Sequence, residues 1–68
     1  MKINNNYLDK FIKTKDCYMY PITKGIYLTF DITTLEYIDV VMYYLPKYRI
    51  DKYANEKLEE LYSRSYLI

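Results

Sequence analysis

The stretch from Ile26 to Leu45 changes its hydrophobic period partway along, and this change restricts the folds open to the chain. Over residues 26–32 apolar side chains alternate with other side chains, a pattern typical of a strand with one buried face. Over residues 35–45 the apolar residues recur at helical spacing instead, at Leu35, Ile38, Met42 and Leu45. The sequence therefore predicts a strand that leads directly into a helix.

The helix predicted over residues 35–45 has an alternative, because the same residues also suit a strand. The adjacent valines and the neighbouring tyrosines in this stretch favour strands. Thr33 and Glu36, however, have the spacing of a capping box, which marks a helix start. Glu36 and Asp39 would share one solvent-exposed face of a helix, whereas regular strand alternation would turn one of them toward the core. We therefore favour a helix over a strand.

A hairpin is expected just before this helix. Residues 17–22 form a second strand candidate, joined to residues 26–32 by a loop that ends in Gly25, the one glycine of the chain. Glycine at the end of such a loop suits a tight turn that needs positive φ. Pro21 cannot donate to a ladder, so we expect the first strand of the hairpin to lie at a sheet edge. The expected cross-strand pairs are Ile22 with Ile26, Tyr20 with Leu28, and Tyr18 with Phe30.

Two further helices are expected toward the ends of the chain. Residues 5–13 begin within the run of asparagines at residues 4–6, which are good N-cap residues, and carry an apolar stripe that includes Phe11 and Ile12. Residues 52–66 follow Asp51, a cap candidate, and their stripe comprises Ala54, Leu58, Leu61, Tyr62 and Ser65. The expected fold is a single α+β domain over residues 1–68, with a helix, an antiparallel β-hairpin and two helices in that order. The alternative is a three-stranded antiparallel sheet with flanking helices.

Composition excludes several classes of function. The chain has 68 residues with one cysteine and no histidine, so neither a disulfide nor an ordinary zinc site is expected. Cys17 has no histidine to act as its base, and Asp31, Glu36 and Asp39 are more simply explained as a cap and solvated carboxylates than as an acid–base pair or a cation site. We expect no enzymatic activity, no metal and no cofactor.

The high tyrosine content is the strongest functional signal. The chain has 11 tyrosines and no tryptophan, and a core this small cannot bury them all. Exposed tyrosine supplies large, stiff contact area with a polar tip and is enriched at protein interfaces. Core positions are expected for Tyr18, Tyr20 and Tyr62. The predicted protein interface comprises Tyr27, Tyr37, Tyr43, Tyr44 and Tyr48.

The charge distribution supports a second hypothesis. The net charge is +1, which does not suggest a strongly basic nucleic-acid binder. Lys10, Lys13 and Lys15 nevertheless cluster near the N-terminus and could contact phosphates, with nearby tyrosines stacking on bases. A small nucleic-acid-binding regulator is therefore the alternative function.

In size and in its Lys/Ile/Asn/Tyr-rich composition the chain resembles the small proteins of phages and mobile elements in low-GC hosts. Many of those proteins bind and block a host enzyme or a defence complex. The resemblance implies a non-enzymatic inhibitor or adaptor that occludes a host or defence protein. A homo-oligomer is a further possibility. The absence of a membrane-spanning run, together with a free cysteine, leads us to expect a cytoplasmic protein without a membrane partner.

Overall fold

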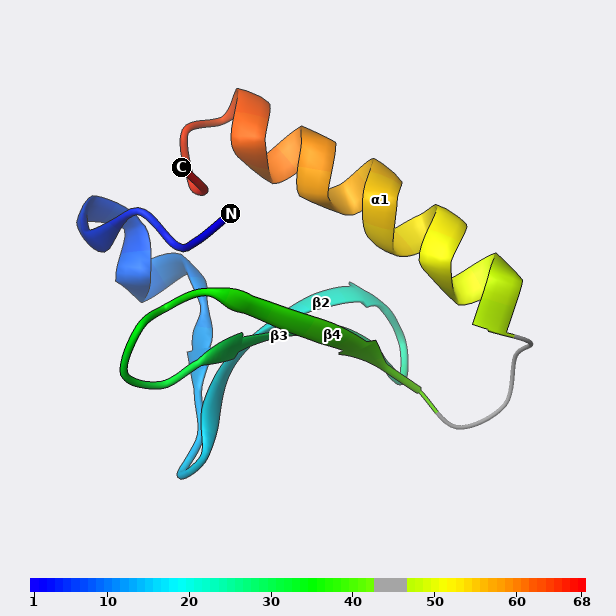
Figure 1. The fold of residues 1–68 in the computed structure, drawn as a ribbon, viewed down its shortest axis with the longest axis horizontal. Coiled ribbons are helices and arrows are strands. Elements are labelled where there is room, and N and C mark those ends of the chain that lie inside the picture. Colours follow the sequence, from blue (N-terminus) through cyan, green and yellow to red (C-terminus); the bar gives the residue numbers. More distant parts are fainter. Residues whose placement is uncertain (43–46) are drawn as a thin grey trace.

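A computed structural model describes the backbone of residues 1–42 and 47–68 and the side chains of residues 1–42 and 49–68. The described chain forms a four-stranded antiparallel sheet of order β1-β2-β3-β4, and a helix then crosses one face of it (Figure 1). The strands are β1 (Ile12–Lys13), β2 (Cys17–Thr23), β3 (Ile26–Asp31) and β4 (Tyr37–Val41), and the helices are the 3-10 helix η1 (Asn5–Lys10) and α1 (Lys47–Ser63). The α+β class is confirmed. Both finer predictions, a helix with a hairpin and two helices and the three-stranded alternative, are wrong.

The hairpin between β2 and β3 is confirmed. Tyr18 pairs with Phe30 and Tyr20 pairs with Leu28, as the alternation predicts. Gly25 has a φ of 80°, which a residue with a side chain adopts only at a cost. The register slips near the turn, where Thr23 rather than Ile22 pairs with Ile26.

Strand β4 replaces the helix predicted over residues 35–45, so that prediction is wrong wherever the structure describes these residues. Phe30 pairs with Tyr37 and Thr29 pairs with Asp39, which leaves Ile38 as the extra residue of a β-bulge. Because of the bulge, Tyr37 and Val40 both pack against the core, while Ile38 is 58% exposed. The inserted residue invalidates the argument from regular alternation, since Glu36 and Asp39 are both exposed although no helix forms there.

The turn before β4 is held by Asp31, and the predicted capping box of Thr33 and Glu36 does not form. Asp31 Oδ1 accepts hydrogen bonds from the backbone N–H groups of Thr33 and Thr34, each at 2.8 Å. The N–H of Leu35 donates to the Asp31 carbonyl at 2.9 Å, and Leu35 itself has a φ of 67°. A carboxylate that binds successive N–H groups offers the backbone an alternative to a helix, and here it stabilises the turn.

The predicted helix over residues 5–13 is also wrong in type and extent. The 3-10 helix η1 ends at Lys10, and Tyr7 inside it has a non-helical φ of −123°. Ile12 and Lys13 instead pair with Met19 and Tyr18 as strand β1. A helix this short is marginal on its own, whereas the extended backbone gains ladder bonds and leaves Phe11 buried in the core.

The last predicted helix is confirmed in existence but not in its limits. Helix α1 begins before Asp51, so Asp51 is not its cap, and it ends at Ser63. Ala54, Leu58 and Leu61 are buried as predicted, whereas Tyr62 is 58% exposed. Tyr62 follows Leu61 directly and therefore lies about 100° around the helix from it.

The two ends of the described chain pair with each other. Lys2 and Ile68 exchange backbone hydrogen bonds of 2.8 Å in both directions, and Ile3 is bridged to Leu67. On the other side of this segment, the N–H of Tyr37 donates to the Met1 carbonyl at 3.0 Å. Figure 1 shows both termini close together, near the C-terminal end of α1. The buried core comprises Ile3, Phe11, Leu28, Phe30, Ala54, Leu58, Leu61 and Leu67.

Candidate functional site

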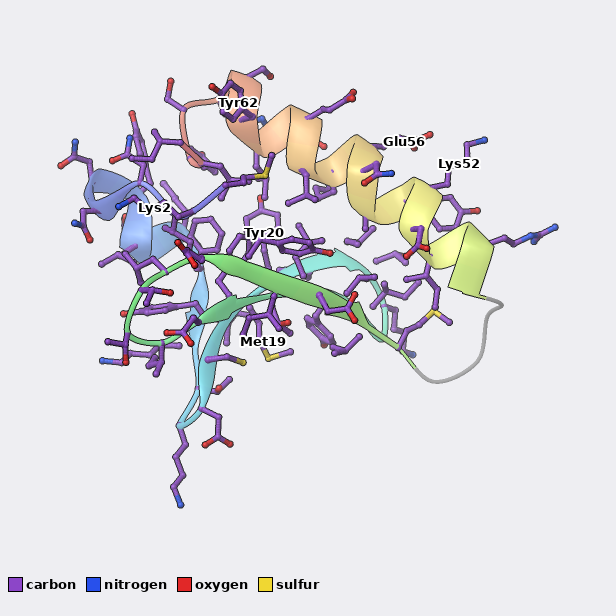
Figure 2. The ribbon with its side chains drawn as sticks, viewed as in Figure 1. Lys2, Met19, Tyr20, Lys52, Glu56 and Tyr62 are labelled. Carbon is purple, nitrogen blue, oxygen red and sulfur yellow. The ribbon has the colours of Figure 1, made fainter. Side chains whose placement is uncertain are left out.

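The two faces of the sheet differ in what covers them. Helix α1 lies over one face, and Tyr20 projects toward the helix into the space between the two layers (Figure 2). Met19, the preceding residue of β2, projects from the opposite side of the sheet. Among the described residues, no helix or strand packs over that second face (Figure 1). We call it the outer face.

The strand register gives the arrangement of side chains on the outer face. Side chains alternate between the two faces along each strand, so residues that are paired in register lie on the same face. One row across the strands contains Ile12, Met19, Thr29 and Asp39, and the next row contains Pro21, Tyr27 and Val41. We define the outer-face patch as Ile12, Met19, Pro21, Tyr27, Thr29 and Val41.

The outer-face patch is mainly apolar yet reaches solvent. Ile12 is 48% exposed, and Met19, Tyr27 and Val41 are half-buried by their neighbours in the sheet. Thr29, in the centre, is only 8% exposed, and its hydroxyl donates a 2.7 Å hydrogen bond to the Asp39 carbonyl. The hydroxyl of Thr29 is therefore already hydrogen-bonded, and apart from the phenol group of Tyr27 the other side chains of the patch present apolar atoms.

The charged side chains at outward strand positions are both acidic and lie on the β3–β4 side. Asp31 pairs with Cys17 beyond one end of the patch, and Asp39 pairs with Thr29 beside it. Hydrogen bonds from the backbone N–H of Thr34 and then of Thr33 hold the pKa of Asp31 below its usual value. Asp31 is therefore ionised at neutral pH.

Asp39 also protects the free edge of β4. Its Oδ1 accepts the N–H of Val40 at 2.8 Å. The Asp31 N–H donates to the Glu36 carbonyl across the β3–β4 ladder. Backbone groups alternate in direction along a strand, so those of Thr29 and Asp39 point at each other, and those of Val40 point away from β3 toward the free edge. A donor that is already bonded cannot receive an added strand, so Asp39 opposes pairing at this edge.

Pro21 lies in an inner strand of the sheet, whereas the sequence predicts an edge strand. Strand β2 lies between β1 and β3, but β1 pairs with only Tyr18 and Met19 of β2. The Cys17 N–H donates to the Thr14 hydroxyl at 3.0 Å, and the Cys17 carbonyl accepts the Thr14 N–H at 2.8 Å. Every second residue of β2, counted from Cys17, therefore directs its backbone groups toward the β1 side. Pro21 follows the same alternation as Cys17, and its missing N–H removes no bond to β3.

The predicted interface tyrosines do not all share one face. Tyr27 lies on the outer face, whereas Tyr37 packs against the core with its ring centroid 5.6 Å from that of Phe30. Burial raises the pKa of Tyr37, and the nearby charges of Asp39 and Asp51 raise it further. Tyr43 and Tyr44 lie outside the described residues, and Tyr48 lies in α1 with its side chain outside them.

The predicted phosphate-contacting lysines come from neighbouring segments at the β1 side of the sheet. Lys10 ends η1, Lys13 lies in β1, and Lys15 lies in the turn before β2; all of them are exposed. Asp9 and Asp16 are exposed in the same segments, which divides the basic charge. These lysines and aspartates therefore together form an edge of mixed charge.

Catalysis or metal binding would draw on the thiol of Cys17 and on acidic side chains. Cys17 is a free, half-buried thiol whose Sγ lies 3.5 Å from the hydroxyl of Thr14. In residues 1–42 and 49–68 there is no cluster of His, Cys, Asp and Glu side chains that could hold a metal ion. The helices of the described chain include none with the length and apolarity needed to span a bilayer.

Two residues of the outer-face patch were missed by the sequence argument because their strands were predicted as helices. Ile12 was assigned to the N-terminal helix, and Val41 to the helix over residues 35–45. The consecutive β-branched residues Val40 and Val41 are the signal that could have identified β4. Met19, Pro21, Tyr27 and Thr29 lie on the outer face as the hairpin alternation predicts.

Comparison of the chain with protein-family models, with curated proteins and with solved structures finds no significant match. What the geometry defines is a small α+β domain, an antiparallel four-stranded sheet with one helix over a single face.

Proposed function

We propose that this chain is a non-enzymatic protein-binding module that binds its partner through the outer-face patch. The observation that carries the proposal is a sheet face whose outward side chains Ile12, Met19, Tyr27 and Val41 are apolar and have no covering element among the described residues. An antiparallel sheet with one solvated face normally alternates apolar with polar residues. A contiguous apolar surface on such a face is typical of an interaction site.

Other surfaces of the domain are less suited to this role. The free edge of β4 has its outward Val40 N–H occupied by Asp39. The solvent side of α1 carries charged residues such as Lys52 and Glu56, with Tyr62 near its end (Figure 2). Charged side chains are depleted at the centres of protein interfaces, whereas Tyr and Met are enriched there. Tyr27 and Met19 are thus the expected anchor residues.

Binding of this kind acts by occlusion and needs no reactive group on the module. We propose an inhibitor or adaptor of the phage or mobile-element type, which covers a functional surface of a host or defence protein. The free thiol of Cys17 suits a reducing compartment such as the cytoplasm.

The test compares capture by variants that alter opposite sides of the molecule. Wild-type protein, Met19→Asp and Tyr62→Asp are immobilised and exposed to nuclease-treated bacterial lysate, and bound proteins are identified by mass spectrometry. Met19→Asp places a charge in the outer-face patch, whereas Tyr62→Asp makes the same change on α1. We expect proteins that bind the wild type and Tyr62→Asp but not Met19→Asp. Equal capture by Met19→Asp, with circular dichroism showing that it is folded, would refute the proposal.

A further inference from the structure

We infer that the partner of the outer-face patch is an amphipathic helix that carries Arg or Lys beside its apolar side chains. The inference rests on the proposed function and adds the chemistry of the partner. It comes from the sign and position of the charges at the patch, from their hydrogen bonding and from the width of the sheet.

The charges at outward strand positions have one sign. Those positions are Ile12, Cys17, Met19, Pro21, Tyr27, Thr29, Asp31, Asp39 and Val41. Asp31 and Asp39 are their charged members, and neither lysine nor arginine occurs among them. A partner that buries the apolar part of this face must therefore place positive charge next to the two aspartates on β3 and β4. Otherwise their negative charges lack an oppositely charged group.

Both aspartates are fixed in place and keep free acceptor capacity. Asp31 Oδ1 receives two backbone N–H groups and Asp39 Oδ1 receives one, at 2.8 Å in each case. An ionised carboxylate has about four acceptor sites, so each can still bind a guanidinium or ammonium group. Lys57 and Arg64 form ion pairs with Glu60, and within residues 1–42 and 49–68 neither aspartate takes part in an ion pair.

The fixed geometry lowers the cost of recognition. A carboxylate already held by the backbone loses little conformational freedom when a partner binds it. Asp31 is held at the turn before β4, and Asp39 at the bulge inside β4. The domain thus presents two preorganised acceptors beside an apolar surface, an arrangement that complements a basic amphipathic segment.

The size of the sheet limits the partner segment. Strands are about 4.8 Å apart, so four strands span roughly 15 to 19 Å, and an α-helix with its side chains is about 10 Å wide. One helix therefore fits across the outer face, as α1 does across the other face (Figure 1). A helix bound there would complete a three-layer arrangement.

The negative charge of Asp31 and Asp39 disfavours other partners at the outer face. Nucleic acid and an anionic membrane would bring negative charge to Asp31 and Asp39. A second copy of the chain would present the same acidic outer face, with no outward lysine or arginine on its strands to oppose the aspartates. The basic helix is the occupant that both the apolar surface and its charges favour.

The experiment uses two synthetic helical peptides that differ only in charge, one of Leu and Lys and one with Glu in place of every Lys. Each is titrated into the isotope-labelled protein of residues 1–68 and followed by NMR. We expect the Leu/Lys peptide to shift the amide signals of Met19, Tyr27, Thr29 and Asp39 saturably, with a Kd of about 10 to 100 μM for so small an interface. The Leu/Glu peptide should leave these signals unchanged.

Matched variants separate a specific site from general attraction between opposite charges. Asp39→Asn keeps the acceptor for the Val40 N–H and removes one negative charge from the outer face, whereas Glu56→Gln removes one from the solvent side of α1 (Figure 2). We expect Asp39→Asn to weaken Leu/Lys binding about fivefold, and Glu56→Gln to change it less than about twofold.

Three results would overturn the inference. The first is equal weakening by the two variants, and the second is a set of shifted signals confined to α1. The third is binding of the Leu/Glu peptide, or of a single-stranded oligonucleotide, at the patch. If the Leu/Glu peptide binds there and Met19→Asp abolishes that binding, the outer face remains the binding surface and only the basic partner is wrong.

Discussion

Ser65 and Leu35 adopt backbone conformations that residues with side chains normally avoid. Ser65 has a φ of 66° just after α1, where its N–H donates to the Tyr62 carbonyl and the N–H of Tyr66 donates to the Leu61 carbonyl, at 3.0 and 2.9 Å. These are the bonds of a Schellman motif, whose left-handed position is usually glycine. Leu35 has a φ of 67° but also packs against the core, which gives leucine a reason to occupy its position.

Ser65→Gly is expected to stabilise the protein. Glycine reaches positive φ without strain, so we expect the free energy of unfolding to rise by about 0.5 to 1 kcal/mol. Ser63→Gly is the matched control, because Ser63 is the last residue of α1 and glycine there should instead destabilise. Urea unfolding of both variants measures the difference. A Ser65→Gly variant no more stable than the wild type would contradict the assigned conformation.

Acid should weaken the turn that Asp31 holds. Backbone hydrogen bonds lower the folded pKa of Asp31 below 3.8, its ordinary value. The stabilisation is therefore fully present above about pH 4 and is lost as pH falls through the lower folded pKa. Glu60 has the same sign, because its hydrogen bond and ion pair with Lys57 lower its pKa.

Asp31→Asn tests this pH dependence, since asparagine keeps the acceptor but cannot ionise. The melting temperature of the wild type should fall more steeply than that of Asp31→Asn between about pH 5 and pH 2. Glu60→Gln serves as a second variant with the same expected direction. Parallel melting curves for the wild type and Asp31→Asn across this range would show that the hydrogen-bonded carboxylate does not contribute.

At the scale of elements, β4 shows how one residue can hide a strand. Tyr37 and Val40 pack against the core three positions apart, and Ile38 between them is bulged out of the ladder. The predicted helical stripe instead included Leu35, Ile38 and Met42, and Ile38 is exposed, because a bulge cannot be recognised from regular alternation. The hairpin from Cys17 to Asp31 could be predicted, since its alternation is regular and Gly25 marks its turn.

Deletion of Ile38 should be tolerated better than deletion of Val40. Without Ile38, Tyr37, Asp39 and Val40 follow regular alternation and keep their present faces. Deletion of Val40 brings Val41 into its place, so the outward pair of Val41 with Tyr27 is lost and β4 becomes shorter. We expect the first variant to lose less than about 2 kcal/mol and the second to lose more than the first. The measurement is chemical denaturation followed by far-ultraviolet circular dichroism. In a helix, either deletion would rotate the residues that follow by the same angle. Similar losses of stability would therefore contradict the assignment of β4 as a strand.

At the scale of the whole molecule, long-range pairing accounts for most of what the sequence did not reveal. The segment around Lys2 and Ile3 lies between the start of β4 and the C-terminal residues, joined by bonds such as that from the Lys2 N–H to the Ile68 carbonyl. Strand β1 likewise exists only through its pairing with β2. Local periodicity cannot predict partners so distant, although it placed Ala54, Leu58 and Leu61 of α1 in the core correctly.

The candidate site follows the same division. Met19, Pro21, Tyr27 and Thr29 could be placed on the outward side of the hairpin from alternation, but whether a helix covered that side depended on the packing of the whole chain. Tyr27 and Tyr37 were predicted on one surface, and the structure places them on opposite faces of the sheet. One face of the sheet is therefore core, and the other is free to bind.

The most direct test is the free energy of unfolding, in urea, of Tyr27→Thr and Tyr37→Thr. Threonine retains a high strand propensity, so the two substitutions differ mainly in the face from which a ring is removed. Tyr37→Thr removes a ring that packs on Phe30 and the core, and we expect a loss of about 3 kcal/mol. Tyr27→Thr should cost less than about 1 kcal/mol, since its neighbours Pro21 and Val41 remain at a solvent-facing surface. Equal losses, or a larger loss at Tyr27, would contradict the assignment of the two faces.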